Sequence, residues 1–157
     1  MVTALPAVDR PIAADHSGSI VVDVPFGLRG GLGIYGRDIA AQALLLATVD
    51  GHPRAVAYTS WIPAPTTKAV KAHPFYERLA AAQQGHRISA ANEVRARQDA
   101  RRLDIGWVVV WYKARKIPIS DVISYLDATG FRFGYQADGV MVYRPAGRAR
   151  DSGSSPR

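Results

Sequence analysis

Short β-branched runs alternate along the chain with stretches of helical spacing. The longest such run, residues 107–112 (W-V-V-V-W-Y), is unbroken and apolar, which predicts a central strand buried on both faces of a sheet. Further strands are predicted at residues 19–26, 54–61, 131–135 and 140–143. Pro25 cannot donate a ladder hydrogen bond, so the first strand must end near it. Asp138-Gly139 predicts a tight hairpin turn between the last two strands.

Apolar residues at helical spacing predict helices between these strands. The helical stretches are residues 37–49, 67–84, 89–104 and 121–129. Pro74 removes a backbone donor, so we expect the second stretch to break at His73 and to restart at Pro74. Ser120 is a suitable N-cap and Gly130 a suitable C-terminal residue for the last helix.

The order of these elements predicts one α/β domain over residues 19–145. Strands separated by helices favour a mainly parallel sheet with helices on both faces, in a Rossmann-like three-layer sandwich with an antiparallel C-terminal hairpin at its edge. Residues 1–18 mix proline and small residues without periodicity, and we expect them to form a flexible lead-in. The composition of residues 146–157 is typical of a disordered tail.

Composition supports a globular protein and narrows its chemistry. The chain has 157 residues, of which 48% are hydrophobic and 21% charged, a balance typical of folded domains. The apolar stretch at residues 39–49 is shorter than the about 20 residues that span a bilayer, and the N-terminus lacks the pattern of a signal peptide. With no cysteine, disulfides and thiolate chemistry are excluded. The net charge of +7 favours anionic partners.

One glycine motif invites an enzymatic interpretation. Gly31, Gly33 and Gly36 form a G-x-G-x-x-G between a predicted strand and a predicted helix, where glycines can admit a pyrophosphate to a helix N-terminus. However, residues 25–30 separate the motif from its strand, and residues 58–61 supply no acid for a ribose. A flexible strand-to-helix loop is the favoured interpretation.

The other polar residues form no recognisable catalytic set. The four histidines lack the spacing of a helical metal site, no G-x-S-x-G elbow is present, and we expect neither a metal nor a cofactor. Asp23 stands within an apolar strand, so its side chain either faces solvent, the more frequent case, or binds a partner. The arginines of residues 95–102 can face phosphates, but the interleaved acids of the 93–104 segment favour a solvated face with ion pairs along the helix.

A succession of motifs resembles a known family. The motifs are V-V-D-V-P-F-G (21–27), Gln42, D-G-H-P-R-A-V-A-Y-T-S (50–60), H-P-F-Y (73–76), D-I-G-W-V-V-V (104–110) and A-D-G-V-M-V-Y-R (137–144). In this order they resemble the soluble C-terminal domain of bacterial, actinobacterial-like, polytopic membrane glycosyltransferases. The D-x-P-x-G turn of those domains is matched by Asp23, Pro25 and Gly27. This chain differs from the family at two positions. His52 follows a glycine, whereas the family has the histidine before the glycine, and Trp61 stands where an arginine is common.

The resemblance implies a role without catalysis in this chain. The family's catalytic acids lie in loops of a membrane part, so we expect a non-catalytic accessory or binding domain on the extracytoplasmic face of the membrane, or in the cytoplasm if this chain is made alone. Its partners would be a polytopic membrane protein, an anionic membrane surface or a glycan. The candidate surface is the end of the sheet where the strand C-termini converge. It comprises Asp23, Gly27, Gly31, Gly33, Gly36, His52 and Ser60.

Two other functions remain open from the sequence. One is a nucleotide- or nucleotide-sugar-dependent transferase or oxidoreductase that uses the loop from Gly31 to Gly36. The other is a basic module that binds nucleic acid or anionic lipid, although the chain lacks the aromatic-interleaved basic strand that stacks single-stranded bases, and nucleic acid is the less favoured partner.

Overall fold

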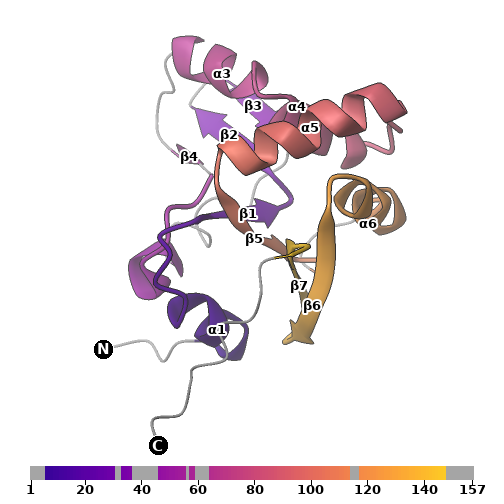
Figure 1. Cartoon of the computed structure of the whole chain (residues 1–157). Helices are drawn as coiled ribbons and strands as arrows, with labels where there is room; N and C mark the ends of the chain where they lie inside the picture. The colour runs from indigo at the N-terminus through magenta and orange to yellow at the C-terminus, as the bar shows by residue number, and fades with distance from the viewer. Residues whose placement is uncertain are drawn as a thin grey trace, which may run out of the picture.

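Two sheets and a layer of helices make up the described structure. The computed structural model describes residues 6–30, 33–36, 46–55, 57–58, 64–113 and 117–147. The elements are η1 (Ala7–Asp9), α1 (Arg10–Ala13), β1 (Ile20–Val24), β2 (Gly27–Gly30), β3 (Gly33–Gly36), β4 (Ala57–Tyr58), α3 (Ala64–Lys71), α4 (Pro74–Ala82), α5 (Ala90–Arg102), β5 (Ile105–Val110), α6 (Ile119–Ala128), β6 (Phe131–Ala137) and β7 (Val140–Pro145), and residues 46–50 are also helical. The chain is therefore an α/β protein, as predicted (Figure 1).

The main sheet has four strands in the order β1-β5-β7-β6. β1 and β5 are parallel, with Val21 opposite Trp107, whereas β5/β7 and β7/β6 are antiparallel. The prediction of a mainly parallel sheet is therefore wrong, and a Rossmann-like sandwich is not confirmed. The reason is that the C-terminal hairpin supplies both strands on one side of β5. In the described part of residues 54–61, Arg54 forms an isolated parallel bridge with Val21, and β4 belongs to the second sheet.

A second sheet has three short strands in the order β3-β2-β4. β2 and β3 are antiparallel with Gly27 opposite Gly36, and β4 is parallel to β2. The glycine-rich run, expected to be a flexible loop, thus forms a β-hairpin. Of the predicted helix at residues 37–49, the described part is helical and ends at Asp50, where Gly51 has a φ of 76°.

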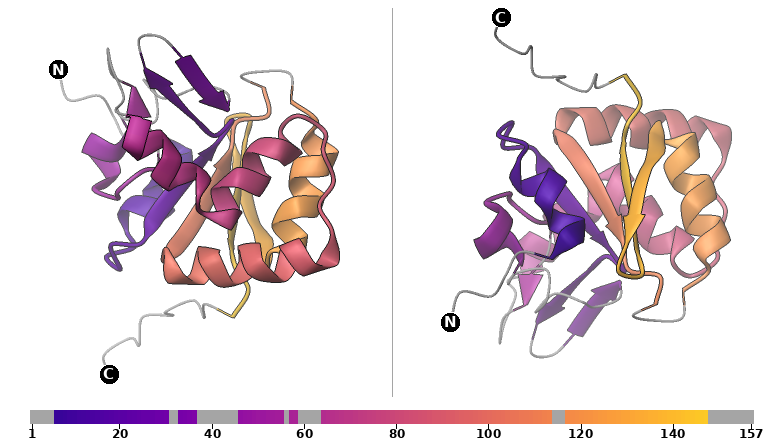
Figure 2. Two further views of the ribbon diagram at one scale, coloured as in Figure 1. Left: turned by 90° about the horizontal axis from the view of Figure 1, so that it is seen from above. Right: turned by 90° about the horizontal axis from the view of Figure 1, so that it is seen from below.

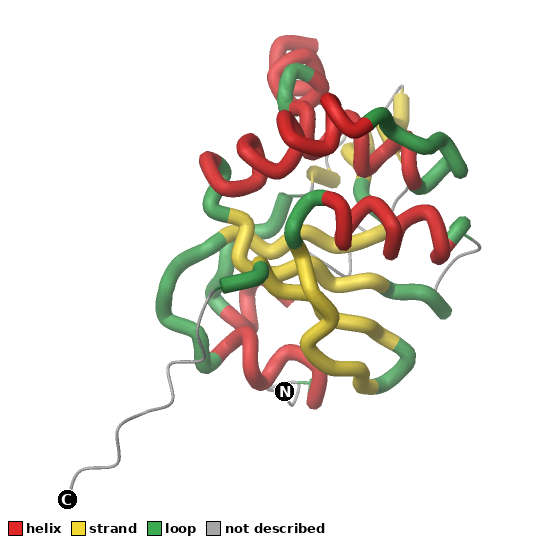
Figure 3. The backbone as a smooth tube through the Cα atoms, turned by 45° about the vertical axis from the view of Figure 1, so that its right-hand side comes forward, coloured by secondary structure: helices red, strands yellow, loops and turns green. Residues whose placement is uncertain are grey.

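The main sheet separates two apolar cores. Alternate residues of β1 and β5 face α4, α5 and α6, including Val22, Val24 and Val108. The residues between them, Val21 and Trp107, face the other core. Figures 1 and 3 show α4 and α5 on one side of the strands and α1 on the other. The predicted buried central strand is confirmed over Trp107–Val110, since all six residues of β5 are buried, whereas Trp111 and Tyr112, also included in the prediction, follow the strand and are half-buried.

The short α1 helix is part of the fold. Residues 7–13, expected to lie in a flexible lead-in, form η1 and α1, and Val8 and Ile12 are 1% and 0% exposed in the second core. In the view from below in Figure 2 this segment lies in front of the strands. It therefore closes the face of the sheet opposite α4–α6. The predicted C-terminal tail lies outside the described residues from position 148 onward.

The predicted helix ends are largely confirmed. α3 ends at Lys71, His73 is the N-cap of α4, and Pro74 is its first residue. Asp99 of α5, expected to face solvent, is instead 8% exposed and accepts hydrogen bonds from the Phe75 amide (3.1 Å) and His73 Nδ1 (3.0 Å). It satisfies a free N–H of the first turn of α4, which the spacing within α5 alone does not reveal.

The ends of the last helix and the hairpin turn are as predicted, with one difference. Pro118, and not Ser120, is the N-cap of α6, because the helix begins one residue before the serine. Gly130 after its end has a φ of 90°. Asp138 and Gly139 have φ values of 52° and 78°, which fits the predicted two-residue turn.

Candidate functional site

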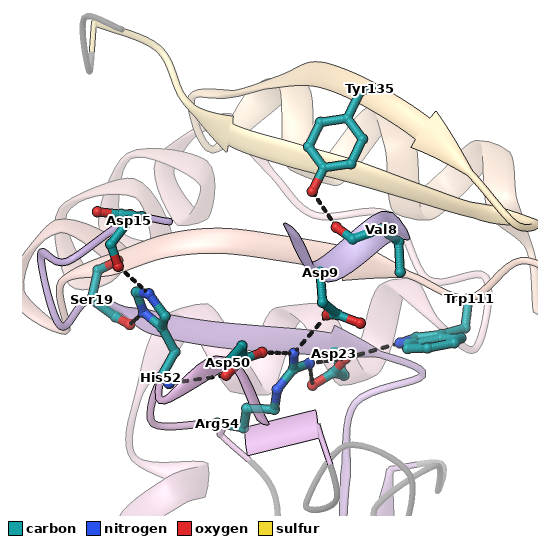
Figure 4. A network of polar contacts seen from close by, with 10 residues as sticks. All are labelled: Val8, Asp9, Asp15, Ser19, Asp23, Asp50, His52, Arg54, Trp111 and Tyr135. Atoms are coloured by element: carbon teal, nitrogen blue, oxygen red, sulfur yellow. Dashed lines mark hydrogen bonds and ion pairs between the residues drawn. The ribbon is translucent and has the colours of Figure 1, made fainter. Parts of the chain in front are cut away.

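A buried polar network is centred on Arg54. Its guanidinium donates from Nη1 to both oxygens of Asp23 (2.7 and 2.8 Å) and from Nη2 to Asp9 Oδ1 (3.1 Å) and to Asp50 Oδ2. All four side chains are 0% exposed. We call these four residues, drawn in Figure 4, the Arg54 network.

The fold brings the four residues together from three separate segments. Asp23 lies on β1 two residues after Val21, so it points toward the core that η1 covers. η1 supplies Asp9 from above this face. The backbone of β1 also bonds to the segment after the 46–50 helix, through Val21 N to Pro53 O (2.9 Å) and Ala55 N to Val21 O (3.1 Å). These bonds fix Arg54 beside the strand.

The network reaches the end of the neighbouring strand through Trp111. The indole Nε1 donates to Asp23 Oδ1 (2.9 Å), and the Trp111 amide donates to Val24 O (2.8 Å). Trp111 follows β5 directly, so the network occupies the carboxyl ends of the one parallel strand pair in the main sheet. This is the edge at which open α/β sheets usually bind ligands.

Burial and mutual attraction shift the pKa values of the residues in the Arg54 network. Burial raises the pKa of Asp9 and of Asp23 above the ordinary value, although the attraction of Arg54 opposes the rise. Burial also acts to lower the pKa of Arg54, but the charge and hydrogen bonds of Asp23 and the bond to Asp50 outweigh it, so its pKa is raised. Three carboxyl groups share one guanidinium, and within the described structure Asp9 Oδ2 and Arg54 Nε have no hydrogen-bond partner.

His52 lies beside the network and is 3% exposed. Its Nδ1 is 2.8 Å from Ser19 O, and its Nε2 is 2.6 Å from Asp15 O. A carbonyl oxygen only accepts hydrogen bonds, so both ring nitrogens can donate only in the doubly protonated imidazolium. The His52 amide also donates to Asp50 Oδ1 (2.9 Å). His52 thus fixes the loop between α1 and β1.

The predicted candidate surface is only partly assembled. Asp23 and His52 do lie near each other, but both are buried and bonded within the protein, so the expectation that Asp23 faces solvent is wrong. Gly27 lies at the start of β2, and Gly33 and Gly36 at the two ends of β3. In the described residues the second half of the glycine motif is therefore a strand and not a strand-to-helix loop, and residues 37–45, where the helix was expected to begin, lie outside the described residues. Gly31 and Ser60 lie outside the described residues.

Two partners of Asp23 are not predicted from the sequence. Arg54 was assigned only to a strand, and Trp111 only to a buried run. Asp9 was also missed, since the segment around it lacks periodicity, although Asp9 stands just before Arg10-Pro11, a pattern typical of a helix start. A charged residue in an apolar strand signals that a partner of opposite charge is needed if it is buried, and Arg54 was the basic residue of the adjoining predicted strand.

A second polar feature lies at the other end of β5, beside the first residues of β5 and β6. Arg97 and Arg101 of α5 and Arg132 of β6 line a cavity of about 150 Å³, with Thr129 and Gly130 at the end of α6. We call it the arginine pocket. The predicted ion pairs of these α5 arginines with Glu93 and Asp99 do not form in the described structure, because Asp99 turns inward to α4 and Arg97 Nη2 donates to Ala128 O (2.6 Å).

The part of the chain that the structure describes contains neither a candidate metal site nor a membrane-spanning helix. No group of three or more His, Cys, Asp or Glu side chains there is arranged to hold a metal ion. Within the same residues, no helix combines the length and hydrophobicity that crossing a membrane requires. Comparison with protein-family models, curated proteins and solved structures found no match.

Proposed function

We propose that this chain is a non-catalytic binding domain that recognises a partner or ligand while bond-making groups reside elsewhere. The observation that carries the proposal is the Arg54 network. At the edge where an α/β enzyme of this kind places its chemistry, Asp23 and Arg54 are bonded to each other and fully buried. Side chains in that state stabilise the fold and are inaccessible to a substrate.

The ordered motifs support a membrane glycosyltransferase as the companion. The match of Asp23, Pro25 and Gly27 to the D-x-P-x-G turn of the family's extracytoplasmic domain now has a physical reason in this chain. Asp23 anchors Arg54 and Trp111, and Gly27 begins the hairpin that follows the turn. In this proposal the domain is an accessory part of a membrane enzyme.

The rival nucleotide-dependent enzyme is less well supported. It requires the glycines from Gly31 to Gly36 to place a phosphate at a helix N-terminus. In the described residues Gly33–Gly36 is a strand paired with Gly27–Gly30, and its backbone groups enter a ladder. The basic binding module has one observation in its favour, the arginine pocket.

The proposal is tested by separating binding from turnover. A tagged form of the chain is produced in its native cells, the membranes are solubilised in mild detergent, and the chain is purified by the tag. We expect a multi-helix membrane protein to copurify. The Arg95→Glu variant, which changes the charge of an exposed α5 residue, is a control for nonspecific electrostatic capture.

The purified chain alone is then incubated with nucleotide sugars, lipid-linked sugars and nicotinamide cofactors. We expect no product above that of a heat-denatured sample. Turnover of a sugar donor or reduction of a nicotinamide by the chain alone would contradict the proposal.

A further inference from the structure

The arginine pocket gathers cationic side chains that are distant in sequence. Arg97 and Arg101 are four residues apart on α5, so they lie on one face of the helix. Arg132 is the second residue of the strand β6 and lines the same pocket. All three are exposed. The ten residues that line the pocket, all within the described structure, include no aspartate or glutamate.

Capping of α6 explains two of these arginines in part. Arg97 donates to Ala128 O (2.6 Å), and Arg132 Nη1 donates to Asp127 O and to Phe131 O (both 3.0 Å). These carbonyls belong to the last turn of α6 and to the residue where β6 begins, and carbonyls at a helix end lack partners within the helix. The bonds hold two guanidinium groups in place while each keeps further N–H donors, since a guanidinium has five.

Capping does not explain Arg101. Within the part of the chain that the structure describes, its side chain has no hydrogen bond or ion pair, and it lines the same pocket. Asp127 lies 3.6 Å from Arg132 Nη1, and both side chains of this pair are more than half exposed. Such an exposed pair is weak. Among the described residues that line the pocket, three arginines therefore face no lining carboxylate.

The arrangement of the arginines favours one class of anion. A carboxylate occupies one planar guanidinium fork, whereas a terminal phosphoryl group has three oxygens that can accept from several forks at once. Ile105 and Phe131 form an apolar part of the lining, which lowers the competition of water for these contacts.

We propose that the arginine pocket binds a terminal phosphoryl group, carried either by a small soluble molecule or by a lipid headgroup. This inference rests on the proposed function, in that it assigns a ligand chemistry to a domain that acts by binding. A phosphomonoester, with its three terminal oxygens, is the preferred form, and a phosphodiester is the weaker one.

Binding of a soluble ligand is measured by calorimetric titration of the full chain with inorganic phosphate at constant ionic strength. We expect saturable binding that the Arg101→Gln variant weakens about tenfold, the effect of losing one charged hydrogen-bonding group. Arg101→Lys should bind with intermediate affinity, because it keeps the charge but loses the fork. The control is Arg95→Gln on the same helix, which is exposed and does not line the pocket.

A lipid source is tested by flotation with three kinds of vesicle. They contain phosphatidylcholine alone, phosphatidylcholine with phosphatidic acid, and phosphatidylcholine with phosphatidylglycerol. Preference for phosphatidic acid that is lost in Arg101→Gln assigns the phosphoryl group to a lipid headgroup. Phosphate binding without any vesicle preference assigns it to a soluble ligand.

Two results would overturn the inference. One is the absence of binding both to phosphate and to the phosphatidic acid vesicles. The other is an equal loss of binding in Arg95→Gln and Arg101→Gln, which would show a response to overall charge alone. Neither result affects copurification with a membrane companion, and turnover by the chain alone would refute the proposed function whatever the pocket binds.

Discussion

At the scale of residues, the main finding is that three buried carboxyl groups share one guanidinium. Removing charges from water is costly, and the attraction between them offsets this cost only when the hydrogen bonds are well formed. Asp23 is well provided, with three hydrogen bonds from Arg54 and Trp111, whereas Asp9 has one oxygen without a partner in the described structure. The network therefore depends on Arg54.

We expect Arg54→Met to destabilise the protein by about 3–5 kcal/mol, since it leaves the buried carboxyl groups without their counter-charge. Urea denaturation followed by circular dichroism measures the free energy of unfolding. The control is Arg10→Met, an exposed residue of α1, for which we expect a change within about 0.5 kcal/mol. A similar small effect for both variants would show that the network contributes little.

The stability of the network should depend on pH through Asp9. Its folded pKa is raised above the ordinary 3.8, first by burial, so the folded state binds this proton more tightly than the unfolded state. The contribution of Asp9 to stability is therefore fully present below pH 3.8 and is lost as the pH rises through the folded pKa. Asp15, whose pKa is lowered, contributes in the opposite sense, losing its contribution as the pH falls below 3.8.

The Asp9→Asn variant should isolate this effect. Its free energy of unfolding, relative to that of the unmodified protein, should increase from about pH 4 to about pH 7, because asparagine cannot ionise. Urea titrations at several pH values measure the difference. Asp138→Asn, in the exposed hairpin turn, serves as the control with a flat difference. A flat or falling difference for Asp9→Asn would contradict the pKa direction.

At the scale of elements, the short N-terminal helices are stabilised by the core that they cover. η1 and α1 together have seven residues, fewer than an isolated helix needs to be stable in water. Their conformation depends on packing of Val8 and Ile12 into the core that includes Trp107 and Val142. The hydroxyl of Tyr135 on β6 also donates to Val8 O.

Ile12→Ala should therefore destabilise the whole protein by about 2–4 kcal/mol, as expected for a fully buried isoleucine. If residues 7–13 were a loose lead-in, the same change would have almost no effect. Hydrogen exchange of the amides of α1 gives a second measurement, with faster exchange expected in the variant. Ala14→Gly just after the helix, where the side chain is exposed, is the comparison for a purely local change.

The sequence predicted elements better than it predicted their assembly. The break before Pro74, the buried strand at Trp107 and the turn at Asp138-Gly139 were all foreseeable, because each depends on local conformational preference. The pairing of β7 with β5 and the transfer of β4 to another sheet depend on contacts between distant segments, which periodicity does not encode. The Arg54 network could not be predicted for the same reason. Asp9 and Arg54 are 45 residues apart, and the local sequence around either residue does not indicate the other.

At the scale of the whole molecule, polar contacts from two tryptophans connect distant parts of the chain on one face of the main sheet. Trp107 Nε1 donates to Asp15 Oδ2 (2.8 Å), and Trp111 Nε1 donates to Asp23 Oδ1 (2.9 Å). Two indoles, one within β5 and one directly after it, thus hold the N-terminal segment and β1. We expect the sheet and its N-terminal cover to unfold together.

This cooperativity is measurable with the tryptophans as reporters. In a Trp61→Phe variant only Trp107 and Trp111 fluoresce, and their urea transition should coincide with the loss of helical circular dichroism, as for a two-state domain. A fluorescence change at lower urea than the dichroism change would show that the N-terminal cover separates first.

The bond between Trp111 and Asp23 joins residues 88 positions apart. During synthesis the first strand leaves the ribosome long before its partner strand, and parallel pairing across such a separation is slow. Until then Asp23 and Arg54 have no completed enclosure, and the β-branched strand around them has an open edge, a feature that promotes association between nascent chains. Charged residues on an exposed strand oppose such association, so we expect Asp23, near the end of β1, to limit aggregation of the growing polypeptide before its partner strand has formed.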